Sequence, residues 1–129
     1  MIQKFQKTER IFIPSYKEKT NTITLEKFLM ENFQFPDEDF EKICGFVRQD
    51  TGLEKIIFEL PNLILSEIKY NKLLIKFYDD FQEDYPQLEV NIFTPIDTIT
   101  SLKIEEKLEA QLYELYDPNS VDKLLIIME

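Results

Sequence analysis

Two short runs in the C-terminal half of the chain have the hydrophobic pattern of strands. Residues 73–78 are rich in aliphatic and aromatic side chains and lie between Asn71 and Asp79, which favours a strand. In residues 88–94, apolar side chains occupy alternate positions and Glu89 and Asn91 lie between them, so the apolar side chains share one face of a pleat. We therefore expect a second strand with one solvent-facing side, as at a sheet edge.

A helical stripe and a final apolar run follow these strands. The pattern predicts a helix over residues 101–116 with Ser101 as its N-cap, ended by Pro118. Its apolar face consists of Ile104, Leu108, Leu112 and Leu115. The consecutive apolar residues 124–128 are typical of a strand covered on both faces. We expect the strand 121–128 in the sheet interior, reached by a parallel crossover.

Helical patterns dominate the N-terminal half. Thr24 is a suitable N-cap for a helix whose buried stripe is Leu25, Phe28, Leu29 and Phe33. Pro36 suits the first position of a second helix, and Gly52 its C-terminal end. The stripe of that helix is Phe40, Ile43, Cys44 and Val47, so Cys44 is predicted to be a buried small side chain. A short strand is predicted at residues 10–13.

Residues 53–68 combine helical spacing with a proline. Because Pro61 lacks a backbone N–H and disfavours helical geometry at Leu60, the pattern predicts a short extended or helical piece up to Leu60. A separate helix opened by Pro61 is predicted to follow.

Together these elements predict an α+β fold with a C-terminal β-β-α-β unit. A largely helical N-terminal half is expected to pack on a mixed sheet of three or four strands. At 129 residues, the chain fits one domain, residues 1–129, with a single core.

The composition excludes several common kinds of site. The chain has no histidine and one cysteine, so it offers no histidine-dependent nucleophilic triad, no internal disulfide and no multi-cysteine zinc site. Glycine-rich phosphate-binding loops are absent from the sequence. No cofactor or metal is predicted. No apolar stretch is long enough to cross a membrane and no signal peptide is recognisable, so a cytoplasmic location is expected.

The negative charge is concentrated in the second half of the chain. The net charge is -10 overall; residues 1–64 hold 9 Lys+Arg and 11 Asp+Glu, whereas residues 65–129 hold 6 and 14. This distribution opposes nucleic-acid binding by the second half, because phosphate repels carboxylates. It favours encounter with a basic partner.

The acidic loop between the two predicted strands is the candidate partner-binding site. Exposed aromatic side chains among charged neighbours are typical of protein interfaces, and a solvated hairpin loop is the simpler alternative. The predicted partner-binding residues are Asp79, Asp80, Phe81, Glu83, Asp84 and Tyr85.

These features suggest a small acidic interaction protein, such as an inhibitor or immunity-type protein that masks a basic protein surface. One alternative is a metal-dependent hydrolase that uses clustered carboxylates, for example Asp37 with Glu67 and Lys69. Another is a structural subunit of a larger assembly, whose signs would be an exposed apolar patch or an unpaired strand edge. The sequence leaves the oligomeric state open.

Overall fold

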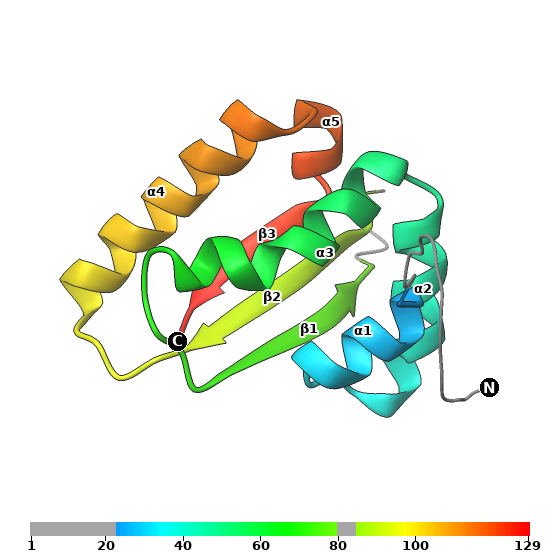
Figure 1. Ribbon diagram of the computed structural model, residues 1–129, viewed down its shortest axis with the longest axis horizontal. Helices are drawn as coiled ribbons and strands as arrows, with labels where there is room; N and C mark the ends of the chain where they lie inside the picture. Colours follow the sequence, from blue (N-terminus) through cyan, green and yellow to red (C-terminus); the bar gives the residue numbers. More distant parts are fainter. Residues whose placement is uncertain (1–22, 80–84) are drawn as a thin grey trace, which may run out of the picture.

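The computed structural model describes residues 23–79 and 85–129, and within them it confirms the α+β class (Figure 1). Three strands form one mixed sheet: β1 (Lys72–Tyr78), β2 (Gln87–Phe93) and β3 (Leu124–Met128). The helices are α1 (Leu25–Asn32), α2 (Phe40–Arg48), α3 (Thr51–Leu65), α4 (Thr98–Leu115) and α5 (Pro118–Val121), with a 3-10 turn at Asp37–Asp39. The strand predicted at residues 10–13 lies outside the described residues.

The strand order is β1-β2-β3, with β1 antiparallel and β3 parallel to β2. The parallel crossover through α4 is thus confirmed, but the predicted positions in the sheet were wrong. β2 is the central strand, although its alternation suggested an edge. β3 is an edge strand despite its continuous apolar run, and Leu125 is 42% exposed. The apolar content of β2 and β3 therefore did not predict their places in the sheet, which depend on how the strands are connected.

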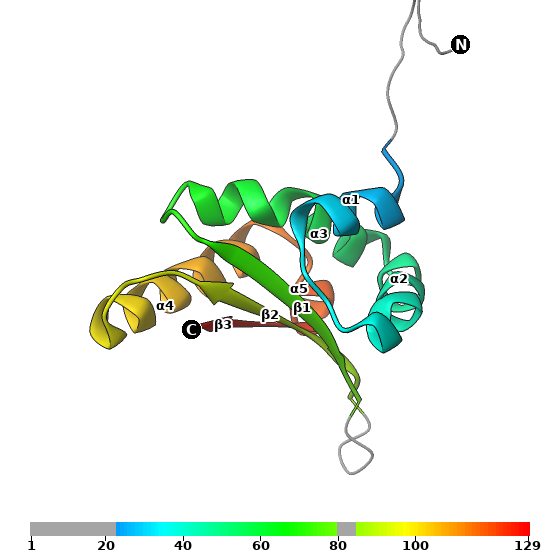
Figure 2. The same ribbon diagram turned by 90° about the horizontal axis from the view of Figure 1, so that it is seen from below.

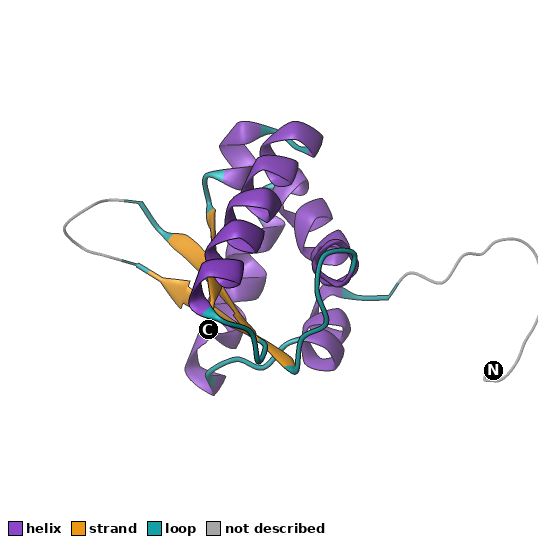
Figure 3. Ribbon diagram, turned by 90° about the vertical axis from the view of Figure 1, so that its left-hand side faces the viewer, coloured by secondary structure: helices purple, strands orange, loops and turns teal. Residues whose placement is uncertain are grey.

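The helices gather on one face of the sheet. Figure 2 shows α1 and α3 on the same side of the strands, and Figure 3 shows the ends of two strands extending beyond the helices. The buried side chains of the helices and of this sheet face form one hydrophobic cluster that includes Ile57, Ile75, Val90 and Leu108.

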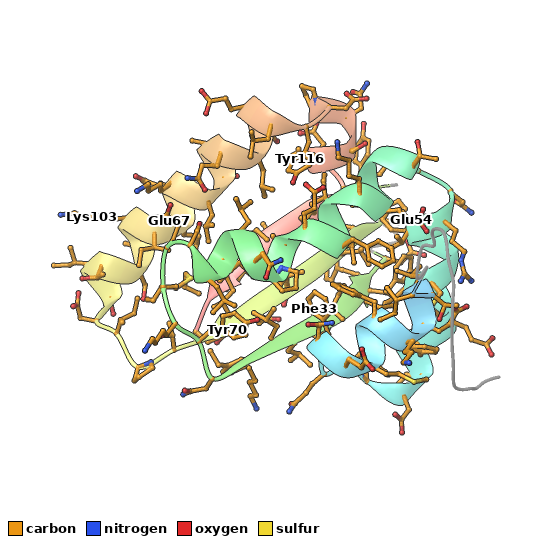
Figure 4. All side chains as sticks on the ribbon, in the orientation of Figure 1. Phe33, Glu54, Glu67, Tyr70, Lys103 and Tyr116 are labelled. Atoms are coloured by element: carbon orange, nitrogen blue, oxygen red, sulfur yellow. The ribbon has the colours of Figure 1, made fainter. Side chains whose placement is uncertain are left out.

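Polar side chains connect α3 with the α4–α5 region. Glu67 lies beside α4 (Figure 4), where its carboxylate accepts hydrogen bonds from Gln111 Nε2 and Lys107 Nζ, both at 3.0 Å. Tyr116 donates its hydroxyl hydrogen to Glu59 of α3. Burial and this bond together raise the pKa of Tyr116 to about 12. These bonds hold α3 and the residues after it beside the α4–α5 region.

The interpretation of residues 53–68 was wrong, because α3 is one continuous helix with Pro61 inside it. Proline removes one helical hydrogen bond. However, Ile56, Ile57, Leu60, Pro61 and Ile64 are all buried, and burial of this apolar face along the whole helix outweighs one missing bond.

Gly52 was also misassigned as the end of the second helix. It lies in the first turn of α3, whose N-cap is Asp50. A Cβ atom on Gly52 would lie 2.4 Å from Ser120 Oγ, so this position requires glycine for close packing against α5.

The helix α4 begins earlier than its stripe suggested. Asp97, rather than Ser101, is its N-cap and accepts a hydrogen bond from the Thr100 backbone N–H at 2.8 Å. Leu108 and Leu112 are buried as predicted, but Leu115 is 58% exposed because it lies at the last residue of the helix. The predicted Thr24 cap, in contrast, is confirmed: Thr24 Oγ1 accepts from Lys27 N at 3.2 Å.

Candidate protein-binding site

The predicted partner-binding loop connects β1 to β2 at one end of the sheet. Asp79 and Tyr85, which lie next to the two strands, are exposed, and Tyr85 is 76% exposed. The other predicted residues, Asp80, Phe81, Glu83 and Asp84, lie outside the described residues. The hairpin is therefore confirmed as the connection, while the site assignment remains a prediction.

A groove of about 640 Å³ lies beside this hairpin. Its walls come from α2, the hairpin, the C-terminal half of α4, and the region that runs from α5 into the start of β3. Tyr78, Tyr85 and Tyr113 line it, with exposures of 52%, 76% and 41%. Three partly exposed tyrosines around one concave surface offer large contact areas at a low cost in side-chain entropy.

Carboxylates form part of the groove wall. Glu109 and Asp122 line it and are exposed. The Tyr113 hydroxyl donates to Asp122 Oδ1 at 2.5 Å, and this hydrogen bond raises the pKa of Tyr113. Among the described residues, no hydrogen bond reaches the second oxygen of Asp122, so it can accept from another donor.

The basic residue in the groove wall is already paired. Lys123 Nζ lies 2.9 Å from Asp50 Oδ2 and 6.0 Å from the centre of the Phe46 ring. Since Asp50 balances the charge of Lys123, Glu109 and Asp122 leave the groove with negative potential.

Two further lysines in the second half of the chain also pair with carboxylates. Lys107 and Lys123 pair with Glu67 and Asp50, which belong to the α3 region, and Lys76 pairs with Glu89 at 3.2 Å. Among the described residues, no ion pair involves the exposed α4 acids Glu106, Glu109 and Glu114. Lys107 and Lys123 thus bind carboxylates of the α3 region instead of these α4 acids.

The described residues offer no support for the carboxylate-metal alternative. Within residues 23–79 and 85–129, no three His, Cys, Asp or Glu side chains gather closely enough to hold a metal ion. Glu67 is instead engaged by Lys107 and Gln111, and Asp37 lies in the 3-10 turn before α2. Cys44 is buried, and burial raises the pKa of its thiol.

Sequence reasoning missed most of the groove. Phe46, Glu109, Tyr113 and Asp122 come from three elements that meet only after folding. The spacing of apolar residues in α4 did not predict that Tyr113 faces the hairpin.

Comparisons of the chain with protein-family models, with curated proteins and with solved structures found no match. Among the described helices, none has the length and apolar character required to cross a membrane.

Proposed function

We propose that this protein is a small acidic binding protein that recognises a basic protein partner through the hairpin end of its sheet. The observation that carries the proposal is the tyrosine-lined groove of about 640 Å³ whose Glu109 and Asp122 carboxylates are not balanced by Lys123. An inhibitor-type protein that masks a basic surface would need this combination of acidic charge and aromatic contact area.

The chemistry of the groove suits an arginine or lysine side chain of the partner. Tyrosine rings attract a cation through their π faces, and the available oxygen of Asp122 accepts charge-assisted hydrogen bonds. The connection between β1 and β2 adds the acidic residues Asp79, Asp80, Glu83 and Asp84 to the sequence. Their contribution is expected mainly in the association rate, since charges at the rim steer encounter.

A quantitative capture experiment tests the proposal. The full chain is immobilised and incubated with extract of its native cells, and the bound proteins are identified and then purified for affinity measurements. We expect at least one basic partner whose binding weakens about tenfold or more when Glu109 and Asp122 are changed to Gln and Asn. Its association should also slow when salt is raised or when Asp79, Asp80, Glu83 and Asp84 are neutralised.

The matched control neutralises two exposed acids away from the groove, Glu38 and Glu41 near the start of α2. This variant has the same net charge as the groove variant. Equal losses in both variants would mean that only the overall charge matters. Binding that is insensitive to salt and to the groove substitutions would refute the proposal.

A further inference from the structure

Several hydrogen-bond donors in the wall of the groove are already bonded within the protein. Gln87 Nε2 donates to Asp122 O at 3.0 Å. Lys123 Nζ donates to Asp50 Oδ2 at 2.9 Å. The Tyr113 hydroxyl donates to Asp122 Oδ1 at 2.5 Å. A ligand that brings donors to these parts of the wall therefore fits better than one that brings acceptors.

The acceptors that stay available in the groove lie close together. Among the described residues, no side-chain hydrogen bond and no ion pair reaches Glu109 or the second oxygen of Asp122. The hydrogen bond to Asp122 and burial raise the pKa of Tyr113, and the charges of Asp122 and Glu109 raise it further, so both carboxylates act on the same hydroxyl group. Glu109 and Tyr113 are also one helical turn apart on α4. We call Glu109, the Tyr113 oxygen and the second oxygen of Asp122 the acceptor cluster.

The acceptor cluster lies where the groove meets a smaller hollow. Glu109 and Tyr113 line both the groove and a hollow of about 90 Å³ between α4 and the start of β3. The buried side chains Leu112, Val121 and Ile126 give this hollow an apolar wall. A long side chain with an apolar stem and a charged head matches this combination of apolar wall and acceptors.

We infer that the acceptor cluster binds a guanidinium group, so that the basic partner inserts an arginine side chain, and not a lysine side chain, into the groove. This inference rests on the proposed function, because it names the side chain that the same groove recognises. The negative charge of Glu109 and Asp122 complements the positive charge of the guanidinium.

A guanidinium matches the acceptor cluster better than an ammonium for two reasons. Its N–H donors lie on several nitrogen atoms in one plane, so it can bond to Asp122 and Glu109 at the same time, whereas an ammonium carries all its donors on one atom. Its flat face also stacks on aromatic rings, and it is less strongly hydrated than an ammonium. Tyr85 and Tyr113 supply exposed rings in the groove wall.

Titration of the full chain with short peptides, followed by nuclear magnetic resonance, tests the inference. The probes are acetyl-Gly-Ser-Arg-Ser-Gly-amide and the same peptide with lysine at the central position. We expect the arginine peptide to bind with a dissociation constant on the order of 1 mM and the lysine peptide to bind about fivefold more weakly. The side-chain amide resonances of Gln87, in the groove wall, should shift on binding. Those of Asn32, which donates to Phe28 O within α1, should not.

The key variant removes one carboxylate of the acceptor cluster. Glu109→Gln should weaken binding of the arginine peptide about fivefold and of the lysine peptide only about twofold, because only the guanidinium bonds to both carboxylates at once. Glu114→Gln is the matched control: Glu114 is an exposed acid of α4 that does not line the groove, and its loss changes the net charge equally. Both constants should stay within about twofold of the wild type.

Far-ultraviolet circular dichroism verifies that each variant is folded, and Asp122→Asn replaces Glu109→Gln if the latter unfolds. Equal affinities for the two peptides, no binding of the arginine peptide, or an arginine preference that persists in Glu109→Gln would overturn the inference. In each of these cases a basic partner that binds through the groove would still support the proposed function. Conversely, an arginine preference that depends on Glu109, in a protein that captures no basic partner, would support the inference and count against the proposed function.

Discussion

Asp50 connects parts of the chain that are far apart in sequence. Its Oδ1 atom accepts from the backbone N–H groups of Gly52 and Leu53, at 2.9 and 3.2 Å, and thereby caps α3. Ser120 Oγ and Lys123 Nζ also donate to the carboxylate, both at 2.9 Å. Burial alone would raise the pKa of Asp50, but the hydrogen bonds from Lys123, Ser120 and Leu53 lower it to about 2.

The first prediction concerns the removal of this carboxylate. Asp50→Ala should lower the free energy of unfolding by about 2–4 kcal/mol at neutral pH, because it removes a helix cap and leaves several donors without their acceptor. Urea unfolding measures the loss. Asp97→Ala removes an exposed cap of α4 and should cost only about 1 kcal/mol. Equal losses in both variants would contradict the connecting role of Asp50.

The same carboxylate predicts a pH dependence. Its pKa is about 2 in the folded protein against an ordinary value of 3.8, so its ionised form stabilises the fold. That stabilisation, about 2 kcal/mol, is fully present above about pH 5 and is lost as the pH falls toward 2. The stability difference between wild type and Asp50→Asn should therefore shrink over this range. A difference that is constant with pH would be inconsistent with the lowered pKa.

The two glycines of the chain make a matched pair for a second prediction. Gly52→Ala places a Cβ 2.4 Å from Ser120 Oγ and should destabilise the protein by about 1–3 kcal/mol, since buried atoms must move apart. Gly45 lies inside α2, where an added Cβ atom would meet no neighbour within 4 Å. Gly45→Ala should stabilise by up to about 1 kcal/mol, because alanine favours the helix. Thermal unfolding distinguishes the two signs.

At the scale of whole elements, the outer edge of β1 is protected by the segment between α1 and α2. The backbone N–H of Gln34 donates to Leu73 O and its carbonyl accepts from Ile75 N, both at 2.8 Å. Further along, Asp39 Oδ2 accepts from the Phe77 backbone N–H at 3.1 Å. An edge strand whose donors are occupied is a poor template for unwanted strand pairing.

This edge gives the third prediction. Asp39→Ala leaves the Phe77 N–H without its acceptor and should lower the free energy of unfolding by about 1–2 kcal/mol. Hydrogen exchange at Phe77 should accelerate more than exchange at Val90 in the central strand. The neighbouring exposed residue Asp37 is the control, and Asp37→Ala should have little effect on either measurement. Unchanged exchange at Phe77 in Asp39→Ala would contradict the role given to this bond.

The element-level predictions succeeded where the local signals agreed. Thr24, the α1 stripe and the α2 stripe containing Cys44 gave a correct cap and buried side chains. The strand 73–78 and the strand 88–94 were located to within one residue at each end. Pro61 and Gly52 led to wrong helix boundaries because proline and glycine usually interrupt helices. Here the burial of α3 outweighs the effect of Pro61, and Gly52 provides the space for Ser120 to pack closely against α3.

At the scale of the whole molecule, some carboxylates are paired with lysines while others stay unpaired on the surface. Lysines of the second half pair with Glu67, Asp50 and Glu89, whereas exposed α4 acids such as Glu106 form no ion pair among the described residues. The net charge of -10 therefore opposes the compact state by self-repulsion while it favours encounter with a cationic partner.

The unpaired surface carboxylates give the fourth prediction. Added salt should stabilise the folded protein but slow its association with a basic partner. Raising the ionic strength from about 10 mM to about 0.15 M shortens the Debye length from about 30 Å to about 8 Å. Because repulsion is screened, the thermal midpoint should rise by a few degrees, whereas association with the proposed basic partner should slow. Changing Glu106, Glu109 and Glu114 together to Gln should raise the midpoint at low salt and reduce its salt dependence. A midpoint that falls on adding salt would contradict this balance.

The sequence by itself determined the α+β class, most helix and strand positions, the antiparallel hairpin with its acidic connection and the excess of negative charge in the second half. These properties follow from local periodicity, turn residues and composition, which do not depend on distant neighbours. Only the tertiary structure decided that β2 is central, that β3 is an edge, that Asp50 joins α3 to α5 and Lys123, and that Tyr113 and Asp122 meet the hairpin in one groove. Those features arise between residues far apart in the chain, and their geometry is fixed only when the helices pack on the sheet.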